Sequence, residues 1–368
     1  RIGVASSSCG SDDDAEIVPY FPDEAEGDTL LDIDLDAAVE RYVRERADFV
    51  ARLLILTDMM GRRTHGLAIS PLYLADIKSG GLQTRGEPKV LKDLGATVVW
   101  DGGYLPGLWL MYRAIDIAME RAKTMGVVTF AIQKSHHIGC LAAHAKQAAD
   151  QGFVAIIANS DPAGKRVAPY GGTEALFTPN PYAIGYPGPE HPVLVDICAS
   201  ITTVSMTRQK FAAGGSFEHP WLLDADGVPT TNPAVLENAE PRGSLQLLGG
   251  QEYGHKGFGM ALMIEALSQG LSGHGRANAP KGWGGNTFLQ VINPEFFAGS
   301  EAFIEQTDFL SEQCRANRPI DAAKPVRMPG DQAALLQEAA LKDGMSYPDV
   351  VWQSLAGYAD ALGVALPK

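Results

Sequence analysis

A histidine between a hydroxyl residue and a glycine is the feature of this chain that most plainly suggests chemistry. Thr64, His65 and Gly66 follow two arginines in the stretch DMMGRRTHGLAISPLY (residues 58–73). Imidazole titrates near neutral pH, and a hydroxyl and a carboxylate can orient it for proton transfer. Asp196, which ends the apolar run HPVLVD, could supply the carboxylate. A lone histidine before glycine can equally be a capping or turn residue, so both interpretations stay open at this point.

Two adjacent histidines form a second candidate. An extended backbone would direct His136 and His137 to opposite sides, so only one of them can face a given ligand. His144 follows closely and raises the question of a metal. Three imidazoles without a convergent carboxylate or a close HxxxH spacing are a poor metal site, and we predict none. Local hydrogen bonds are the simpler interpretation for His144 and for one member of the pair.

The run GHKGFGM (residues 254–260) resembles a glycine-rich loop before a helix. Glycines let backbone N–H groups approach an oxyanion, a helix N-terminus favours negative charge, and Lys256 could pair with it. It matches neither the GxGxxG nor the GxxxxGK[ST] pattern. A tight turn that allows close helix packing is the alternative interpretation.

The elements that must position these residues can be predicted from periodicity. Helical spacing over residues 34–60 leads into the first motif, so His65 should lie at or just after a helix end. A second helix should stop at Gly126, because a glycine commonly follows the last helical residue. A strand, a loop with a helix ending at Gly152, and a second strand over 153–158 should follow, which indicates an α/β sheet.

Polar residues follow both predicted strands. Ser135, His136 and His137 come after the first, and Asn159, Ser160 and Asp161 come after the second. Ligands of α/β sheets bind beyond the carboxyl ends of the strands, so the chemistry should be there.

Composition excludes several classes of protein. The net charge is −14 and no Lys/Arg cluster stands out, so nucleic acid and anionic membranes are not expected partners. The four cysteines are far apart without a CxxC pair, which argues against zinc and a disulfide framework and favours a reducing compartment. No apolar run approaches about 20 residues and no signal pattern begins the chain, so we expect a cytoplasmic protein.

Read together, ordered segments of the chain resemble one family. They run from about residue 50 to about residue 331 and include GRRTHG, SHHIGCLAAHAKQAADQG, ANSDPAG, VLVDICAS, LLDADGVPTTNPA, GHKGFGMALMIEAL and VRMPGD. The resemblance is to the malate/L-lactate dehydrogenase family that is distinct from the Rossmann-fold enzymes of the same names. That family also holds ureidoglycolate, sulfolactate and diketogulonate oxidoreductases and piperideine-2-carboxylate reductase.

The resemblance implies an α/β fold with a non-Rossmann cofactor domain, whose sheet is mixed and largely antiparallel, and a helical or mixed substrate domain built from both chain ends. The expected division is an irregular acidic arm (1–34), a substrate and dimerisation domain (35–105 and 275–368) and an NAD(P)-binding domain (106–274). A homodimer is expected.

The implied activity is NAD(P)H-dependent hydride transfer to C2 of a small 2-oxo acid or cyclic ketimine acid (a cyclic imine acid), with oxidation of the 2-hydroxy acid as its reverse. His65 would be the proton donor, Thr64 and Asp196 would orient it, and His137 would lie beside substrate and nicotinamide. NAD and NADP stay open. A family member that binds NAD(P) or a metabolite without turnover is the alternative, and a metal-dependent hydrolase is a third.

The resemblance also indicates binding residues. We assign the substrate to Tyr73, Arg63, Asn159 and Ser160. The cofactor contacts it implies are Ser135, His136, Ile138, Gly139, Tyr186, Pro187, His255, Lys256 and, in a strand-end segment, Arg327, Pro329, Gly330 and Asp331.

One departure from the family pattern concerns the substrate. The family has HGxxR with a tyrosine four residues later, whereas this chain keeps Tyr73 and has Ile69 at the arginine position. An arginine there would form a charge-assisted fork with the substrate carboxylate, which an aliphatic side chain cannot replace. Either Arg62, Arg63, Lys165 or Arg166 takes over this role, or the substrate is less anionic or bulkier than malate or lactate.

Overall fold

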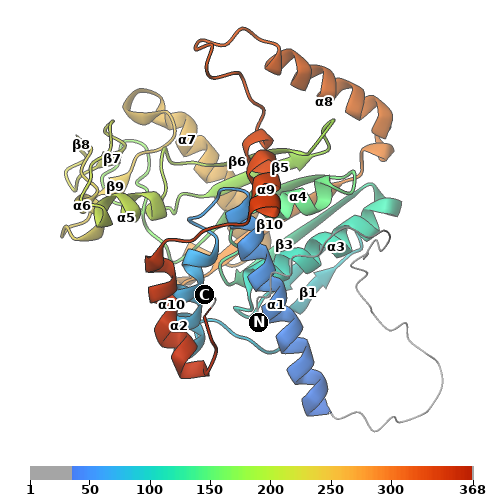
Figure 1. Cartoon of the computed structure of the whole chain (residues 1–368), viewed down its shortest axis with the longest axis horizontal. Coiled ribbons are helices and arrows are strands. Elements are labelled where there is room, and N and C mark those ends of the chain that lie inside the picture. The colour runs from blue at the N-terminus through green and yellow to red at the C-terminus, as the bar shows by residue number, and fades with distance from the viewer. Residues whose placement is uncertain (1–34, 367–368) are drawn as a thin grey trace.

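The computed structural model describes residues 35–366 of the chain (Figure 1), so the predicted acidic arm over 1–34 lies outside the described residues. The helices are α1 (Leu35–Met59), α2 (Ser70–Ser79), α3 (Gly107–Met125), α4 (Leu141–Ala149), α5 (Val204–Ala212), α6 (Ala234–Glu237), α7 (Gly250–Glu265), α8 (Ser300–Arg315), α9 (Asp331–Asp343) and α10 (Asp349–Leu362). The strands are β1 (Lys89–Asp93), β2 (Thr97–Asp101), β3 (Val127–Ser135), β4 (Val154–Ser160), β5 (Pro181–Tyr186), β6 (Val193–Cys198), β7 (Leu222–Leu223), β8 (Pro229–Thr230), β9 (Ser244–Leu245) and β10 (Gly285–Ile292).

A seven-stranded sheet forms the centre of the molecule, with the strand order β1-β2-β3-β10-β4-β5-β6. Only the β2–β3 pair is parallel, and the other five pairs are antiparallel. The expected mixed, largely antiparallel sheet is therefore confirmed. Strand β10 enters late in the sequence and separates β3 from β4, which run in the same direction on either side of it.

This insertion brings the ends of β3 and β4 together. Ser135 pairs with Gly285, and Ser160 pairs with the next residue of β10, Asn286. The residues that follow β3 and β4 therefore leave the sheet at the same end of its strands, as the sequence predicted.

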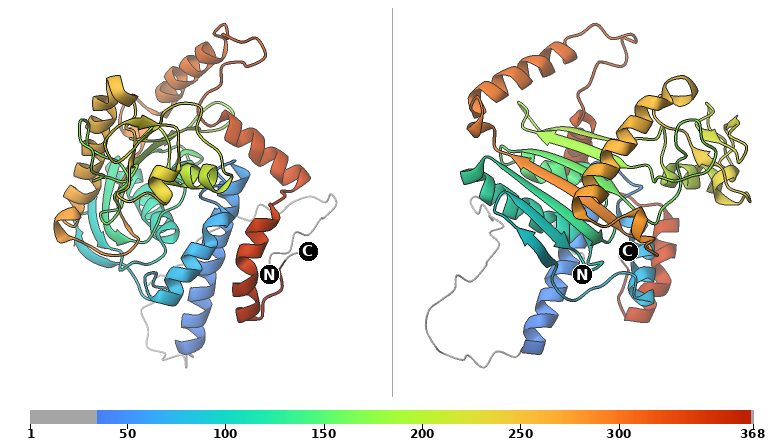
Figure 2. Two further views of the ribbon diagram at one scale, coloured as in Figure 1. Left: turned by 90° about the vertical axis from the view of Figure 1, so that its left-hand side faces the viewer. Right: turned by 180° about the vertical axis from the view of Figure 1, so that it is seen from behind.

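Helices cover both faces of this sheet (Figure 2). Helices α3 and α4 pack on one face, where Met111 and Ile115 lie with Phe130 and Ile132 in the main core. The C-terminal part of α7 and the π-helical turn Ala266–Gly270 pack on the other. Helix α3 ends as predicted, because Gly126 has a φ of 75° and its N–H bonds to the carbonyl of Ala122.

A small sheet with the order β8-β7-β9 lies beside the main one, next to α5 and α6 (Figure 1). It has its own core of buried side chains, among them Val167, Phe177, Leu222 and Leu236. The segments over 89–101 and 285–292, which the sequence assigned to the substrate domain, are strands of the main sheet. The predicted domain boundaries stay a prediction.

The two ends of the described chain meet on one side of the molecule. Helix α9 packs on α1, and α10 packs on α2. The hydroxyl of Tyr358 in α10 donates to the carbonyl of Pro71 in α2 at 3.3 Å. Across residues 35–366, no helix is long and apolar enough to cross a membrane.

Two local predictions are wrong. The GHKGFGM run is not a loop before a helix but lies inside α7, which begins at Gly250. A Cβ on Gly257 would meet the N of Leu248 at 2.6 Å and the carbonyl oxygen of Ala199 at 2.7 Å, so close helix packing explains this glycine. The segment around Arg327 does not end a strand but leads into α9.

His144 is a buried structural histidine of α4, as the simpler interpretation proposed. Its Nε2 donates to the carbonyl of Ile138 at 2.7 Å, and burial lowers its pKa to about 4. In the unfolded chain the imidazole binds a proton below about pH 6.5, whereas in the folded chain His144 binds one only below about pH 4. The free energy of unfolding is therefore at its full value above about pH 6.5 and decreases as the pH falls from about 6.5 to about 4.

We predict that His144 alone lowers the free energy of unfolding by about 3 kcal/mol between pH 7 and pH 4. Urea unfolding of the wild-type chain and of His144→Gln, whose amide keeps a donor but does not titrate, measures this. The difference in unfolding free energy between the two proteins should change in favour of the variant as the pH falls. A difference independent of pH would contradict the prediction.

Candidate active site

His65 lies in a turn directly after α1, as predicted. The helix ends at Met59, Gly61 takes a φ of 78°, and the N–H of Arg62 bonds to the carbonyl of Thr57 at 3.0 Å. The N–H of His65 then bonds to the carbonyl of Arg62 at 2.9 Å. Because both hydrogen bonds join backbone atoms, the end of α1 determines the backbone position from which the His65 side chain extends.

A buried carboxylate that the sequence did not single out supports this turn. Asp58 accepts hydrogen bonds from the N–H of Leu67 at 2.7 Å and from the hydroxyl of Tyr347 at 3.0 Å. Burial raises its pKa, and these two bonds and the charge of Arg63 oppose the rise. A Cβ on Gly66 would lie 1.9 Å from Oδ1 of Asp58, which explains the glycine after His65.

The His65 ring is half-buried and held by its neighbours. Its Nδ1 lies 2.9 Å from the hydroxyl of Thr64, and its ring stacks on that of His137 with centroids 5.7 Å apart and planes at 20°. Burial lowers the pKa of His65, the negative charge of Asp196 opposes this, and the positive charge of Arg62 adds to it. His65 is therefore predominantly neutral at pH 7.

His137 is held by Tyr73. The Tyr73 hydroxyl lies 2.7 Å from Nδ1 of His137, and burial raises the pKa of this phenol, so it stays protonated. Burial also lowers the pKa of His137 well below the ordinary value, with the neighbouring histidines adding to the effect. When the phenol donates to Nδ1, the neutral imidazole carries its own proton on Nε2, which becomes a hydrogen-bond donor.

His136 is directed elsewhere, which agrees with the expectation for adjacent histidines. Its Nε2 lies 3.0 Å from Oδ2 of Asp76 in α2. Trp283 packs against both histidines, with its ring centroid 5.0 Å from His136 and 4.7 Å from His137. Sequence reasoning missed Trp283, although an aromatic residue among the glycines of KGWGG (281–285) was an available signal.

Asp196 is near His65 but its hydrogen bonds go to α4. Its Oδ2 accepts from the N–H of Ala142 at 3.0 Å, at the helix N-terminus, and the thiol of Cys140 lies 3.5 Å away. Its charge acts on His65 through space. A hydrogen-bonded relay from Asp196 through His65 to Thr64 stays a prediction.

The polar residues at the end of β4 bond to neighbouring strands and helices. Asn159 accepts from the hydroxyl of Thr287 in β10 at 2.8 Å. Ser160 is fully buried and donates to Glu265 at 2.7 Å, and Glu265 pairs with Arg276 at 2.9 Å. Their assignment to the substrate stays a prediction, like that of Arg63.

The predicted cofactor residues fall in separate places. Next to the histidines lie Ser135, His136, the buried Ile138 and Gly139, whose φ is 72°. Tyr186 meets Phe303 of α8 edge to face at 6.1 Å, with Pro187 after it, and His255 and Lys256 are exposed on α7. Arg327 is exposed, Pro329 accepts from the N–H of Leu194 at 2.9 Å, and Asp331 after Gly330 pairs with Arg315 at 2.7 Å.

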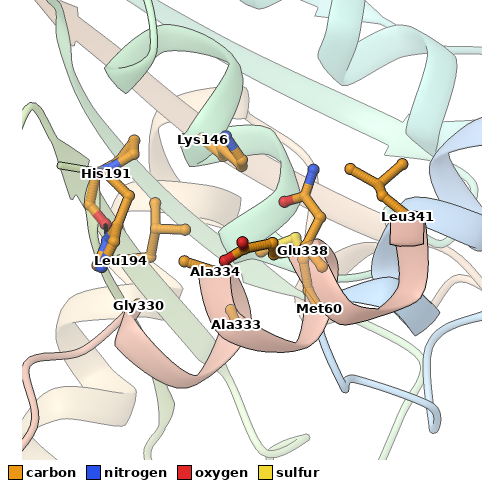
Figure 3. Close-up of a pocket in the computed structure, with 11 residues that line it drawn as sticks. Met60, Lys146, His191, Leu194, Gly330, Ala333, Ala334, Glu338 and Leu341 are labelled. Carbon is orange, nitrogen blue, oxygen red and sulfur yellow. Dashed lines mark hydrogen bonds between the residues drawn. The ribbon is translucent and has the colours of Figure 1, made fainter. Parts of the chain in front are cut away.

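A mostly apolar cavity of about 230 Å³ lies between α9, α4 and the start of β6 (Figure 3). Gly330 contributes to it, and so does Leu194, two residues before Asp196. Met60, Ala333 and Leu341 line it, with Lys146 and Glu338 as charged groups. Over residues 35–366 no group of three or more His, Cys, Asp or Glu side chains is placed to hold a metal ion.

Comparisons with known proteins agree with one another. A family model described as malate/L-lactate dehydrogenase matches residues 39–356. Hydroxycarboxylate dehydrogenase B of Escherichia coli (strain K12) is 31% identical over 327 residues, which covers 87% of this chain and 89% of that protein. L-lactate dehydrogenase of Cupriavidus necator is 28% identical, covering 90% and 95%. The solved structure of malate dehydrogenase from Pyrococcus horikoshii OT3 has a TM-score of 0.77 and 27% identity, covering 87% and 90%.

We predict that Gly66→Ala lowers the free energy of unfolding by about 2–4 kcal/mol, because the new Cβ displaces the Asp58 carboxylate from its two partners. Urea unfolding measures the loss. Gly357→Ala is the control, since nothing lies within 4 Å of the corresponding Cβ on exposed α10. Equal effects of the two substitutions would contradict the proposed support of the turn.

Proposed function

This chain belongs to the malate/L-lactate dehydrogenase family, and from that premise we propose that it reduces a small 2-oxo acid or cyclic ketimine acid with NAD(P)H. The reverse reaction is oxidation of the 2-hydroxy acid. The observation that carries the proposal is the stacked pair of half-buried imidazoles, His65 and His137, each with a hydroxyl group on Nδ1.

The proposed chemistry assigns a different part to each imidazole. NAD(P)H, when bound, would supply the hydride for C2, so this chain's own residues must provide the proton for the carbonyl oxygen. His65 in its protonated form gives that proton, while Thr64 on Nδ1 directs Nε2 toward the substrate. His137, held by Tyr73, offers its Nε2–H to the same oxygen as negative charge develops there.

The residues present suit a nicotinamide cofactor. The Trp283 ring, partly buried beside His136 and His137, offers a flat surface on which a planar nicotinamide could stack. The apolar cavity beside Gly330 offers a place for an uncharged ring of the dinucleotide. The family supports a nicotinamide cofactor, and the choice between NAD and NADP is left open.

The expected homodimer is part of the same proposal. Exposed large side chains on α8, among them Phe309 and Leu310, support a partner surface there, because monomers rarely leave such side chains in clusters.

One prediction from the proposed function concerns substrate turnover. We expect NADH or NADPH oxidation, followed at 340 nm, with at least one of pyruvate, oxaloacetate, bulkier 2-oxo acids and piperideine-2-carboxylate. His65→Ala should lower kcat/KM by about 10²- to 10⁴-fold with little change in cofactor affinity. The exposed His219 provides the control, and His219→Ala should leave the rate unchanged. Cofactor binding without turnover across the panel would favour the non-catalytic alternative.

Another prediction from the proposed function concerns the pH dependence of kcat/KM. Since burial lowers the pKa of His65, its protonated form is populated only in acid. The kcat/KM for reduction should therefore be highest at low pH and fall as the pH rises through an apparent pKa below about 6.5. The oxidation direction, which needs the neutral imidazole, should show the opposite limb. A reduction rate that rises between pH 5 and pH 7 would contradict His65 as the proton donor.

A further inference from the structure

The position where the family has its carboxylate-binding arginine is part of the core in this chain. Ile69 is 8% exposed and belongs to the main core with Leu53, Met60 and Tyr73. Its side chain offers neither a charge nor a hydrogen bond to a ligand. If the substrate carries a carboxylate, another residue near His65 must bind it.

Arg62 has the required position. It begins the turn that closes on His65, and in such a turn the first and fourth Cα atoms lie within about 7 Å of each other. Its side chain is exposed, and within residues 35–366 its guanidinium makes no hydrogen bond or ion pair. The backbone of Arg62 is held at both ends by hydrogen bonds, so the free side chain starts from a defined point.

The positive charge of Arg62 acts on two groups of the site. Burial raises the pKa of the Cys140 thiol to about 12, and the positive charge of Arg62 opposes this rise. The same charge adds to the lowering of the His65 pKa, for which burial is the larger cause. Arg62 therefore lies within electrostatic reach of His65 and of Cys140, whose thiol is beside Asp196.

The neighbouring arginine lies toward a different group. The charge of Arg63 acts on Asp58, whose pKa is raised mainly by burial, and on Tyr347. Arg166, another candidate, donates from Nη1 to the carbonyl of Lys165 at 2.8 Å and has Arg242 as its main charged neighbour. Of these arginines, Arg62 is the one whose carbonyl accepts from the N–H of His65, and its charge also acts on that imidazole.

We propose that Arg62 binds the carboxylate of the substrate in place of the residue at position 69, and so makes this chain specific for carboxylate substrates. This inference rests on the proposed function. A guanidinium can form two parallel hydrogen bonds with a carboxylate, and the carboxylate of a 2-oxo acid is bonded directly to C2. A cation beside His65 would thus hold the carbonyl oxygen toward the imidazole. In a chain of net charge −14 it also provides a local attraction for an anion.

The test compares Arg62→Gln, Arg62→Lys and the matched control Arg52→Gln, which removes the same charge from an exposed position of α1. For a 2-oxo acid that the wild-type enzyme reduces, Arg62→Gln should raise KM by about 10- to 100-fold, and Arg62→Lys should recover part of the loss. Arg52→Gln should change KM less than about threefold. With the neutral amide of the same 2-oxo acid, Arg62→Gln and the wild type should have the same kcat/KM. Unchanged melting temperatures would show that the variants are folded.

A binding measurement separates this inference from the proposed function. Isothermal titration of oxamate, an unreactive 2-oxo carboxylate, onto the enzyme saturated with NAD(P)H should show the same 10- to 100-fold weakening in Arg62→Gln. Wild-type turnover with Arg62→Gln unaffected would overturn the role of Arg62 and leave the proposed function intact. Selective loss of oxamate binding without turnover of any substrate would overturn the proposed function and leave the carboxylate site intact. Equal losses in Arg62→Gln and Arg52→Gln would show a general charge effect and overturn the inference.

Discussion

The placement of the candidate active site depends on the hydrogen bonds of one buried carboxylate. Asp58 joins the end of α1 to the N–H of Leu67 and to Tyr347, which is 289 residues away in sequence. His65 lies on the short turn between the first two of these points. A buried carboxylate is tolerated only when its oxygens are paired, so the loop and the C-terminal segment must both be in place around it. The position of the imidazole is thus coupled to the packing of α9 and α10 on α1 and α2.

Burial also determines the charge of the site. His65, His136, His137 and His144 all have lowered pKa values, and burial is the first cause in each case. Two ionised groups then act on the largely neutral His65, Asp196 with a negative charge and Arg62 with a positive charge. This distribution of charge supports the proposal that Arg62, rather than an imidazole, binds the substrate carboxylate.

The structural features that depend on a local residue pattern could be predicted from the sequence. The helix end at Gly126, the strands flanking α4 and the opposite directions of His136 and His137 follow from periodicity and backbone alternation. The GHKGFGM run was misread because glycines in a loop and glycines in a closely packed helix look the same, and only the contacts of Gly257 with Ala199 and Leu248 distinguish them. Asp58 and Trp283 were missed because their partners are distant in sequence, and the bonds of Ser160 with Glu265 and Gln269 could not be predicted for the same reason.

The insertion of β10 has a consequence for how the chain acquires its structure. During synthesis β3 and β4 emerge long before Gly285–Ile292, and each has an edge that only β10 pairs. Unpaired strand edges bind other strands readily, and distant pairings form slowly. The two halves of the central sheet therefore stay unpaired with each other while more than a hundred further residues are synthesised. The segments that follow β3 and β4 take their final positions only when one late strand joins the halves.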